Sequence, residues 1–314
     1  ARLRAIRKTL ARWYEASRRD LPWRRTRDPY RVWISEIMLQ QTRVAAVVPY
    51  YERFLERFPT VDALAAAGDD ELLAAWAGLG YYSRARNLRE AARRITAAGA
   101  FPRSHAEILA LPGIGPYTAA AVASIAFDLP FAVLDGNVMR VLSRLTHDDG
   151  DIGAPATRAR MQASAQRLLD PANPALHNQA MMELGATICL PRDPKCEICP
   201  VAGDCAAHAA GLERELPIKL RKVVIRRVRR TLLAVIRDGQ ILLWQRSRDA
   251  AMLGGFWELP EPDQLSEATH RQVVYSFSHA ITNHIYEFQV ESGRAEAVAG
   301  VQWVALAELS RIPL

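Results

Sequence analysis

The chain has 314 residues, of which 50% are hydrophobic and 24% are charged. This balance is typical of a globular protein with room for about two domains of roughly 150 residues, and it excludes a disordered tail. No apolar run reaches the roughly 18 residues that a membrane helix needs, so we expect no membrane span. Lys and Arg number 41 against 34 Asp and Glu, and the formal net charge of +7 fits a polyanionic partner such as a nucleic acid.

Residues 1–212 are predicted to be almost wholly helical, because apolar residues recur at three- and four-residue spacing between Pro and Gly breaks. The Arg-rich start lacks the apolar stretch and cleavage site of a targeting sequence, so we interpret it as a basic amphipathic helix. Asp28 and Pro29 predict the start of a helix that runs to about Val48. Glu36 lies on this helix between apolar neighbours, where a carboxylate either faces solvent or lies in a cleft.

A glycine turn separates the next two predicted helices. Ser104 and Glu107 have the spacing of a capping box, and a later helix is predicted from Pro116 to about residue 127. Between them, Gly113 and Gly115 offer backbone N–H groups at a helix N-terminus, an arrangement that can hold a phosphate without reading base sequence. An ordinary helix connection that needs a positive φ would have the same sequence.

A second carboxylate, Asp135, precedes a predicted helix that begins with Gly136 and Asn137. Judged by its local sequence, Asp135 is a helix N-cap. Two carboxylates in unlike surroundings also suit cleavage of a glycosidic bond, in which one donates a proton to the leaving group and the other stabilises a sugar cation. The residues alone do not show that Glu36 and Asp135 meet.

All four cysteines lie within a short stretch near the end of the helical region, separated by six, two and five residues. Such clustering in a chain without secretory features favours a metal centre over disulfides, because four thiolates on one loop can close around a soft centre. Zinc and an iron–sulfur cluster are both compatible with this spacing.

The chain changes character after residue 212. Residues 220–230 contain six Lys or Arg and no acid, so residues 213–230 are interpreted as a basic linker, either solvated or tracking DNA phosphates. Beyond it, β-branched runs at residues 231–236 and 241–246 flank Asp238 and Gly239, a hairpin signal. Further strands are predicted at 285–290 and 298–304, with a helix starting at 305–309. We therefore expect a small mixed α/β domain.

Five motifs in this order resemble the helix-hairpin-helix DNA glycosylase superfamily and, more narrowly, the MutY-type adenine DNA glycosylases. They are residues 33–42, 78–84, the hairpin at 111–115, residues 135–138 and the cysteine spacing. The resemblance implies a multi-domain fold: an all-α helix-hairpin-helix glycosylase domain (residues 1–212) and a C-terminal α/β Nudix-like domain (residues 231–314). It divides the first into a six-helix barrel with the hairpin (22–128) and a cluster subdomain (1–21 and 129–212), and it assigns a [4Fe-4S] cluster to Cys189, Cys196, Cys199 and Cys205.

The resemblance also implies an activity and a partner. The family removes adenine that lies opposite 8-oxoguanine or guanine in double-stranded DNA, as part of base excision repair. Because the adenine is flipped out of the duplex, unstacking costs a few kcal/mol that other contacts must offset. We expect a monomer that resides in the bacterial cytoplasm at the nucleoid, since the cysteines are predicted to be reduced and no targeting signal is evident.

The family's functional positions match residues of this chain. By resemblance, Glu36 protonates the adenine, Asp135 stabilises the sugar cation, and Tyr117 and Asn137 support this centre. The residues matching the adenine pocket are Arg19, Trp23, Arg24 and Glu183, of which Arg19 and Arg24 could instead be solvated charges. The residues matching DNA contacts are Gln41, Thr42, Leu79, Tyr81, Gly113, Gly115, Thr282, Asn283 and His284. Tyr81 could instead be a core aromatic, and residues 281–284 could instead form a β-turn with incidental polar groups.

Two positions narrow the expected chemistry. Endonuclease III-like relatives carry a Lys where this chain has Tyr117, and a phenol cannot form a Schiff base, so we expect a glycosylase that does not cut the strand. The Nudix-like domain lacks the Glu-rich magnesium motif, so pyrophosphate hydrolysis is not expected. The family reads 8-oxoguanine with a Phe-Ser-His loop, which we match to residues 281–283 followed by His284.

The alternative functions for the whole chain are a pyrimidine or mismatch glycosylase on the same scaffold and a non-catalytic iron–sulfur DNA-binding protein.

Overall fold

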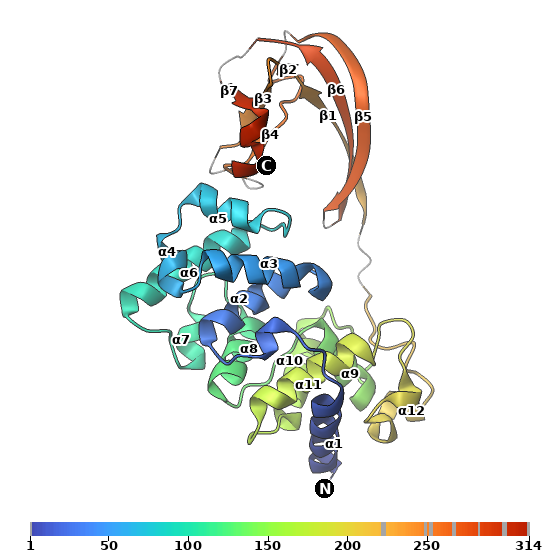
Figure 1. Cartoon of the computed structure of the whole chain (residues 1–314). Helices are drawn as coiled ribbons and strands as arrows, with labels where there is room; N and C mark the ends of the chain where they lie inside the picture. The colour runs from blue at the N-terminus through green and yellow to red at the C-terminus, as the bar shows by residue number, and fades with distance from the viewer. Residues whose placement is uncertain are drawn as a thin grey trace. The chain divides into compact units, whose positions relative to one another are not determined.

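The computed structural model describes residues 2–220, 224–247, 250, 254–265, 268–281, 283–296 and 300–312. The chain forms two compact units (Figure 1), of which unit 1 comprises Ala1–Ala67 and Ser83–Arg221, and unit 2 comprises Gly68–Tyr82 and Lys222–Leu314. The boundary after residue 221 falls inside the segment interpreted as a linker. In the described part of the chain, no helix has the length and apolar character needed to cross a membrane.

Unit 1 consists of helices joined by turns and loops, as predicted, and its described residues contain no strand. Its α-helices are α1 (Arg2–Ser17), α2 (Pro29–Leu39), α3 (Val44–Arg57), α4 (Val61–Ala66), α6 (Ser83–Ala98), α7 (His105–Leu109), α8 (Pro116–Phe127), α9 (Gly136–Thr146), α10 (Pro155–Leu168), α11 (Pro174–Thr187) and α12 (Ala206–Ala209). Short 3-10 turns are η1 (Pro22–Arg24), η2 (Cys196–Ile198) and η3 (Ala202–Asp204).

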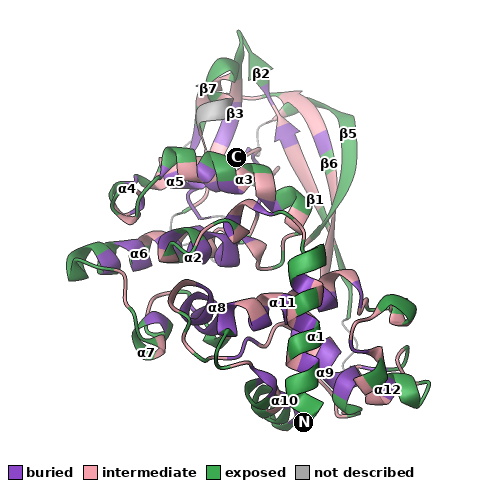
Figure 2. Cartoon of the chain, turned by 60° about the horizontal axis from the view of Figure 1, so that its bottom comes forward, coloured by how far each residue is buried: buried purple, intermediate pink, exposed green. Residues whose placement is uncertain are grey.

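Helix α8 forms the centre of unit 1. Every residue from Thr118 to Ile125 is buried, and α8 packs against α2, α7 and α11 (Figure 2). Its run of alanines allows these helices to approach closely, because small side chains leave the backbones near one another. Helix α2 is buried from Val32 to Met38, including the carboxylate of Glu36. Two helices that carry predicted catalytic groups are therefore held rigidly in the core.

The predicted starts of several helices are confirmed. Asp28 caps α2 by accepting the Arg31 backbone N–H at 2.9 Å. Ser104 and Glu107 form a complete capping box at α7. Helix α8 begins at Pro116, as predicted. These short-range signals depend only on neighbouring residues, which is why they can be identified from local sequence.

The prediction of one helix reaching Val48 is wrong, because α2 and α3 are separate helices. Between them Gln40 has a ψ of 115°, which ends the helical path, and Gln41 follows with a φ of 59°. Arg84 on α6 holds this end, since its Nη1 donates to the backbone oxygens of Ile37 at 2.8 Å and Gln40 at 2.6 Å. A cation at a helix C-terminus binds carbonyl groups that the helix leaves unpaired.

Unit 2 contains two sheets and the helix α5 (Asp69–Trp76). One sheet has the order β1 (Arg226–Ala234), β6 (His284–Arg294), β5 (Thr269–Ile281), with β1 parallel and β5 antiparallel to β6. The other joins β2 (Ile236–Arg237), β3 (Gln240–Gln245) and β4 (Trp257–Glu258), with β7 (Val301–Ala305) also paired to β3. A small core packs between Leu233, Leu242 and Val301.

The strands in unit 2 follow the prediction in outline. The hairpin at Asp238 and Gly239 is confirmed, with positive φ at both residues, and it joins β2 to β3. Strand β1 begins at Arg226, inside the predicted linker. The helix expected after residue 304 is a 3-10 turn, η4 (Leu306–Arg311). In the described part of residues 222–314 there is no α-helix, so the α component of the predicted α/β domain is not seen there.

Candidate active site

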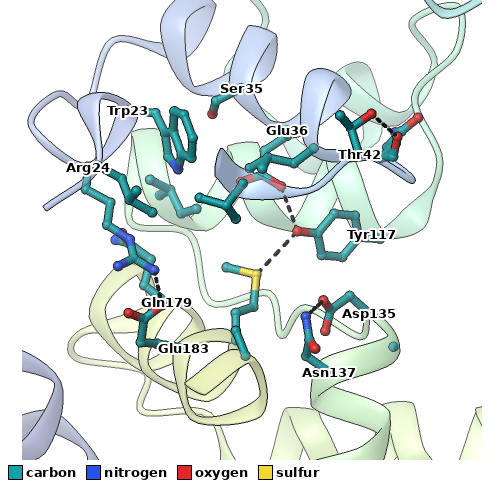
Figure 3. A pocket seen from close by; sticks show the side chains of 18 of the residues that line it. Trp23, Arg24, Ser35, Glu36, Thr42, Tyr117, Asp135, Asn137, Gln179 and Glu183 are labelled. Atoms are coloured by element: carbon teal, nitrogen blue, oxygen red, sulfur yellow. Dashed lines mark hydrogen bonds and ion pairs between the residues drawn. The ribbon is translucent and has the colours of Figure 1, made fainter. Parts of the chain in front are cut away.

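One pocket of about 600 Å³ in unit 1 brings together most of the predicted catalytic and base-binding residues (Figure 3). Its walls come from η1, α2, α8, α11 and the start of α9. The predicted residues that line it are Arg19, Trp23, Arg24, Glu36, Gln41, Thr42, Tyr117, Asp135, Asn137 and Glu183. Glu36 and Asp135, whose meeting the residues alone did not show, therefore share one cavity.

Glu36 lies in the middle of α2 and is only 5% exposed. Its Oε2 accepts a hydrogen bond from the Tyr117 hydroxyl at 2.6 Å. Burial raises the pKa of Glu36 to about 7, even though the hydrogen bond from Tyr117 acts in the opposite direction. A carboxyl group with this pKa retains a proton at neutral pH in a large fraction of molecules, which suits a general acid.

Asp135 is the N-cap of α9 and also points into the pocket (Figure 3). Its Oδ1 accepts the Val138 backbone N–H at 2.7 Å, and its Oδ2 accepts the Asn137 side-chain amide at 2.8 Å. Burial raises the pKa of Asp135, while these two donors and the nearby charge of Arg140 lower it. The capping role and the predicted functional role are therefore compatible, since one residue can fulfil both.

Arg140 is a residue of this site that the motif comparison missed. Its Nη2 donates to Asn137 Oδ1 at 2.8 Å and to the Gly185 backbone oxygen at 2.7 Å, and its Nε donates to the Cys189 backbone oxygen at 2.7 Å. A Cβ on Gly185 would lie 2.6 Å from the Asn137 Cβ, so this close approach of α9 and α11 requires glycine. The only signal in the sequence was the three-residue spacing of Asn137 and Arg140 on one helix.

Glu183 on α11 is an ionised carboxylate in a buried position, 1% exposed. Arg19 donates to it from its backbone N at 3.0 Å, its Nε at 2.8 Å and its Nη2 at 2.6 Å, and Arg24 donates from Nη2 at 2.7 Å. Burial alone would raise the pKa of Glu183, but these donors outweigh it and hold the pKa at about 2. Arg19 and Arg24 are thus paired, and the alternative of solvated charges is not what the structure contains.

Tyr14 on α1 supports this group and was not predicted. The guanidinium carbon of Arg24 lies 5.4 Å from the centre of the Tyr14 ring, a cation–π contact. The Tyr14 hydroxyl donates to Gln179 Oε1 at 3.0 Å, and Gln179 lines the pocket. Helix α1 therefore does more than carry basic charge, because its buried face fixes one wall of the cavity.

The glycine hairpin has the geometry that its sequence predicts. Gly113 has a φ of 74°, and a Cβ there would lie 2.6 Å from the Asn87 Cβ. Gly115 is the N-cap of α8, and both glycines are exposed. Gly113 and Gly115 do not line the catalytic pocket, but α8 connects them directly to Tyr117. A phosphate bound at this helix N-terminus would lie within about one helical turn of Tyr117.

The remaining predicted DNA contacts lie at turns. Gln41 and Thr42 occupy the turn after α2 and line the pocket. In unit 2, Tyr81 has a φ of 50° and is 39% exposed, so it is not a core aromatic, whereas Leu79 is buried at 6%. Asn283 lies in the turn before β6, whose first residue is His284, and the Asn283 backbone oxygen accepts the Arg226 backbone N–H at 2.8 Å. Thr282 lies outside the described residues.

The Phe-Ser-His sequence itself occurs at another place in unit 2. Phe277, Ser278 and His279 reproduce the three residues in order, and they lie in strand β5 rather than in a loop. Phe277 is 41% exposed and its ring stacks on Phe288 of β6 at 4.9 Å.

The four cysteines are half-buried in the loop after α11, and none forms a disulfide. Burial and the charges of the other three cysteines together raise the pKa of the Cys199 thiol to about 11. Four thiolates on one loop need a cationic centre to hold them. Arg144 donates to Cys189 Sγ at 3.2 Å, a contact that suits a cluster thiolate.

This donor set fits an iron–sulfur cluster. Cys189, Cys196, Cys199 and Cys205 provide four sulfur ligands, the number that a [4Fe-4S] cluster takes. His208 and Glu213 lie beside Cys196, with their ligand atoms within 4.8 Å of its sulfur and of one another. They are not needed to complete the sulfur set.

Two protein families match the chain. The HhH-GPD superfamily of base excision DNA repair proteins matches residues 34–167, and the iron–sulfur binding domain of endonuclease III matches residues 189–205. The second match begins at the first cysteine and ends at the fourth. It decides between the metals that the spacing left open, and the loop binds a [4Fe-4S] cluster.

Curated relatives carry one common name. An adenine DNA glycosylase of Mycolicibacterium smegmatis is 40% identical over 250 residues, which is 78% of this chain and 84% of the relative. The adenine DNA glycosylase of Rattus norvegicus is 48% identical over 65% of this chain and 42% of its own length. That of Arabidopsis thaliana is 34% identical over 92% of this chain and 52% of its own length. The chain thus spans about half the length of some curated relatives.

Solved structures share the fold of unit 1. A thermostable thymine-DNA glycosylase has a TM-score of 0.59 and 30% identity, covering 66% of this chain and 97% of its own. An endonuclease III–DNA complex has a TM-score of 0.56 and 24% identity, covering 67% of this chain and 97% of its own. With the pocket, the hairpin and the cysteine loop described above, these similarities establish that the chain belongs to the adenine DNA glycosylase family of helix-hairpin-helix base excision repair proteins.

Proposed function

We propose that this chain removes adenine from double-stranded DNA in which adenine is mispaired with 8-oxoguanine or guanine. The observation that carries the proposal is the placement of Glu36 and Asp135 in one pocket with unlike surroundings. A buried acid with a raised pKa and a carboxylate held by amide donors are the pair that cleavage of an N-glycosidic bond requires. The name shared by the curated relatives supports adenine as the base.

In this reaction the adenine nucleotide leaves the base stack and enters the pocket. Glu36 gives its proton to a ring nitrogen of adenine, so the base becomes a better leaving group and the bond to the sugar weakens. Asp135 stays ionised and stabilises the positive charge that develops on the sugar, before water completes the hydrolysis. Asn137 fixes the orientation of Asp135 through its 2.8 Å hydrogen bond.

The other predicted residues bind rather than react. Arg19, Trp23, Arg24 and Glu183 form the wall that holds the flipped adenine. Gln41 and Thr42 contact the DNA beside the extruded base, as do Leu79 and Tyr81. The backbone N–H groups of Gly113 and Gly115 bind a phosphate.

Strand cleavage is not part of the proposed activity. The position after Pro116 carries Tyr117, whose pKa burial raises well above 10. A phenol cannot form the Schiff base on which β-elimination depends. The product is therefore an abasic site in an intact strand.

Unit 2 supplies recognition of the opposite base in this proposal. We assign it a Nudix-like role in which Phe277, Ser278 and His279 probe 8-oxoguanine, together with Thr282, Asn283 and His284. The enzyme acts as a monomer at the bacterial nucleoid. Cys189, Cys196, Cys199 and Cys205 would hold the [4Fe-4S] cluster, which would cross-link the loop after α11 and make it rigid.

A single-turnover assay tests this function. Duplexes carrying adenine opposite 8-oxoguanine, guanine or thymine, and thymine opposite guanine, are incubated with wild type, Glu36→Gln and Asp135→Asn. We expect wild type to release adenine from the first two, and each variant to lose about 100-fold or more in rate. Equal release by all three proteins, or strand nicking by wild type without added base, would contradict the proposal.

The thymine–guanine duplex addresses the second candidate. The thymine-DNA glycosylase of known structure is 30% identical to this chain, so a mismatched thymine is the rival substrate. Preferential release of thymine would favour that reading over the adenine proposal.

A further inference from the structure

The hydroxyl of Tyr117 has two acceptors and only one proton. It lies 2.6 Å from Glu36 Oε2 and 3.3 Å from the thioether sulfur of Met182 on α11. Both contacts are drawn in Figure 3, where the phenol oxygen lies between the carboxylate and the sulfur. A hydroxyl donates one hydrogen bond at a time, so the direction in which the Tyr117 proton points depends on whether the Glu36 carboxyl group accepts a hydrogen bond or donates one.

The protonation state of Glu36 decides that direction. An ionised Glu36 can only accept, so Tyr117 donates to it. A protonated Glu36 can donate its own proton to the Tyr117 oxygen, and the phenol proton must then point elsewhere. Met182 is the acceptor on that side, a weak one but within sulfur hydrogen-bond distance at 3.3 Å.

We propose that Met182 is a positioning residue, whose sulfur accepts the Tyr117 proton while Glu36 is protonated and so preserves the form of Glu36 that can give a proton away. Without this acceptor, Tyr117 would keep donating to Glu36 and would favour the ionised carboxylate. The motif comparison assigned Met182 no role. The inference rests on the proposed function only in that it needs Glu36 to act as the acid.

The charged groups around Glu36 have opposing effects on its protonation state. Asp135, at the start of α9, favours the protonated form of Glu36, and Arg24 of η1 favours the ionised form. On α11, the negative charge of Glu183 is already balanced by its ion pairs with Arg19 and Arg24. The substitution of an uncharged Met182 alters none of these charges.

The test is the pH dependence of single-turnover adenine release by the full chain. Met182→Leu keeps the size of the side chain and removes the acceptor, and we expect its alkaline limb to move about half a pH unit lower, with a roughly threefold slower rate above the limb. Met182→Gln restores an acceptor and should return the limb to the wild-type position or higher. Met181→Leu is the matched control, because Met181 is buried at 3% and does not line the pocket.

A double-mutant cycle with Tyr117→Phe separates the proposed role from a packing effect. If the sulfur acts through the phenol proton, Met182→Leu should cause no further shift once the phenol is absent. An unshifted limb in Met182→Leu, or the same shift in the Tyr117→Phe background, would overturn the inference. Absence of adenine release by wild type would instead refute the proposed function, so the two failures are distinguishable.

Discussion

Replacing Glu36 with Gln should stabilise the protein at pH 8 while it removes the proposed proton donor. Burial raises the pKa of Glu36 from its ordinary 4.5 to about 7. Because the folded-state pKa lies above the unfolded one, the stability linked to this proton is fully present below about pH 4.5 and is lost as the pH rises through about 7. At pH 8 the wild type therefore contains a buried charge that the Gln variant avoids.

The expected size of the effect follows from the pKa difference. One pKa unit corresponds to about 1.4 kcal/mol, so a rise from 4.5 to about 7 is worth about 3 kcal/mol. Glu36 is only 5% exposed, so solvent screens little of this cost. Since the Gln side chain loses the charge-assisted hydrogen bond from Tyr117, we expect about 2 kcal/mol in practice, or roughly 4–8 °C in Tm.

Thermal and urea unfolding of both proteins at pH 5, 6, 7 and 8 measures the effect. The difference in Tm between Glu36→Gln and wild type should be small at pH 5 and should grow towards pH 8. Glu52→Gln is the control, because Glu52 on α3 is exposed and should give a pH-independent difference. A Tm difference for Glu36→Gln that does not change between pH 5 and pH 8 would refute the reasoning that burial penalises this charge.

Three further predictions follow from the same structure. Glu183→Gln should lower the free energy of unfolding measured with urea at pH 7 by about 2 kcal/mol, a value that allows for the partly exposed Arg19 partner. This loss should shrink as the pH falls from about 4.5 to about 2, because the wild-type carboxylate, with its low pKa of about 2, is then protonated and no longer stabilises the fold. Gly113→Ala should lower Tm and weaken duplex binding, because Gly113 has a φ of 74° and a Cβ there would lie 2.6 Å from the Asn87 Cβ. Gly115→Ala is the control, because a Cβ at that position meets no atom within 4 Å and should leave Tm near that of wild type. Equal Tm values for the two variants would contradict this prediction. Cys199→Ser should lose iron and visible absorption together with several degrees of Tm, and retention of all three would contradict four-cysteine ligation.

The parts of the fold that the sequence predicts are those that depend on near neighbours. The caps of α2 and α7, the glycine hairpin before α8 and the β-turn at Asp238 and Gly239 all follow from residues a few positions apart. The end of α2 does not, because Arg84 from α6 caps it across 44 residues. No periodicity within the helix contains that information.

The residues of the candidate site also fall into two groups, those contained in family motifs and those whose roles depend on long-range packing. The family motifs contain Glu36, Asp135 and Tyr117, but their meeting in one cavity depends on how α2, α8 and α9 pack. The roles of Met182 and Arg140 were not predicted, because they depend on partners on other helices, Tyr117 on α8 for Met182 and Gly185 on α11 for Arg140. Long-range packing of this kind could be inferred only through resemblance to a known family.

The two carboxylates differ in proton affinity because of where each lies on its helix. Glu36 is in the middle of α2, where the helix itself uses every backbone N–H, so the carboxylate accepts from a side chain, the Tyr117 hydroxyl. Asp135 is at the N-terminus of α9, where backbone N–H groups are unpaired, and it receives one from Val138 as well as the Asn137 amide. Burial raises the pKa of both groups, and the two amide donors of Asp135 offset part of that rise. Position along a helix therefore favours Glu36 as the proton donor and Asp135 as the charge that stabilises the sugar, although both are carboxyl groups.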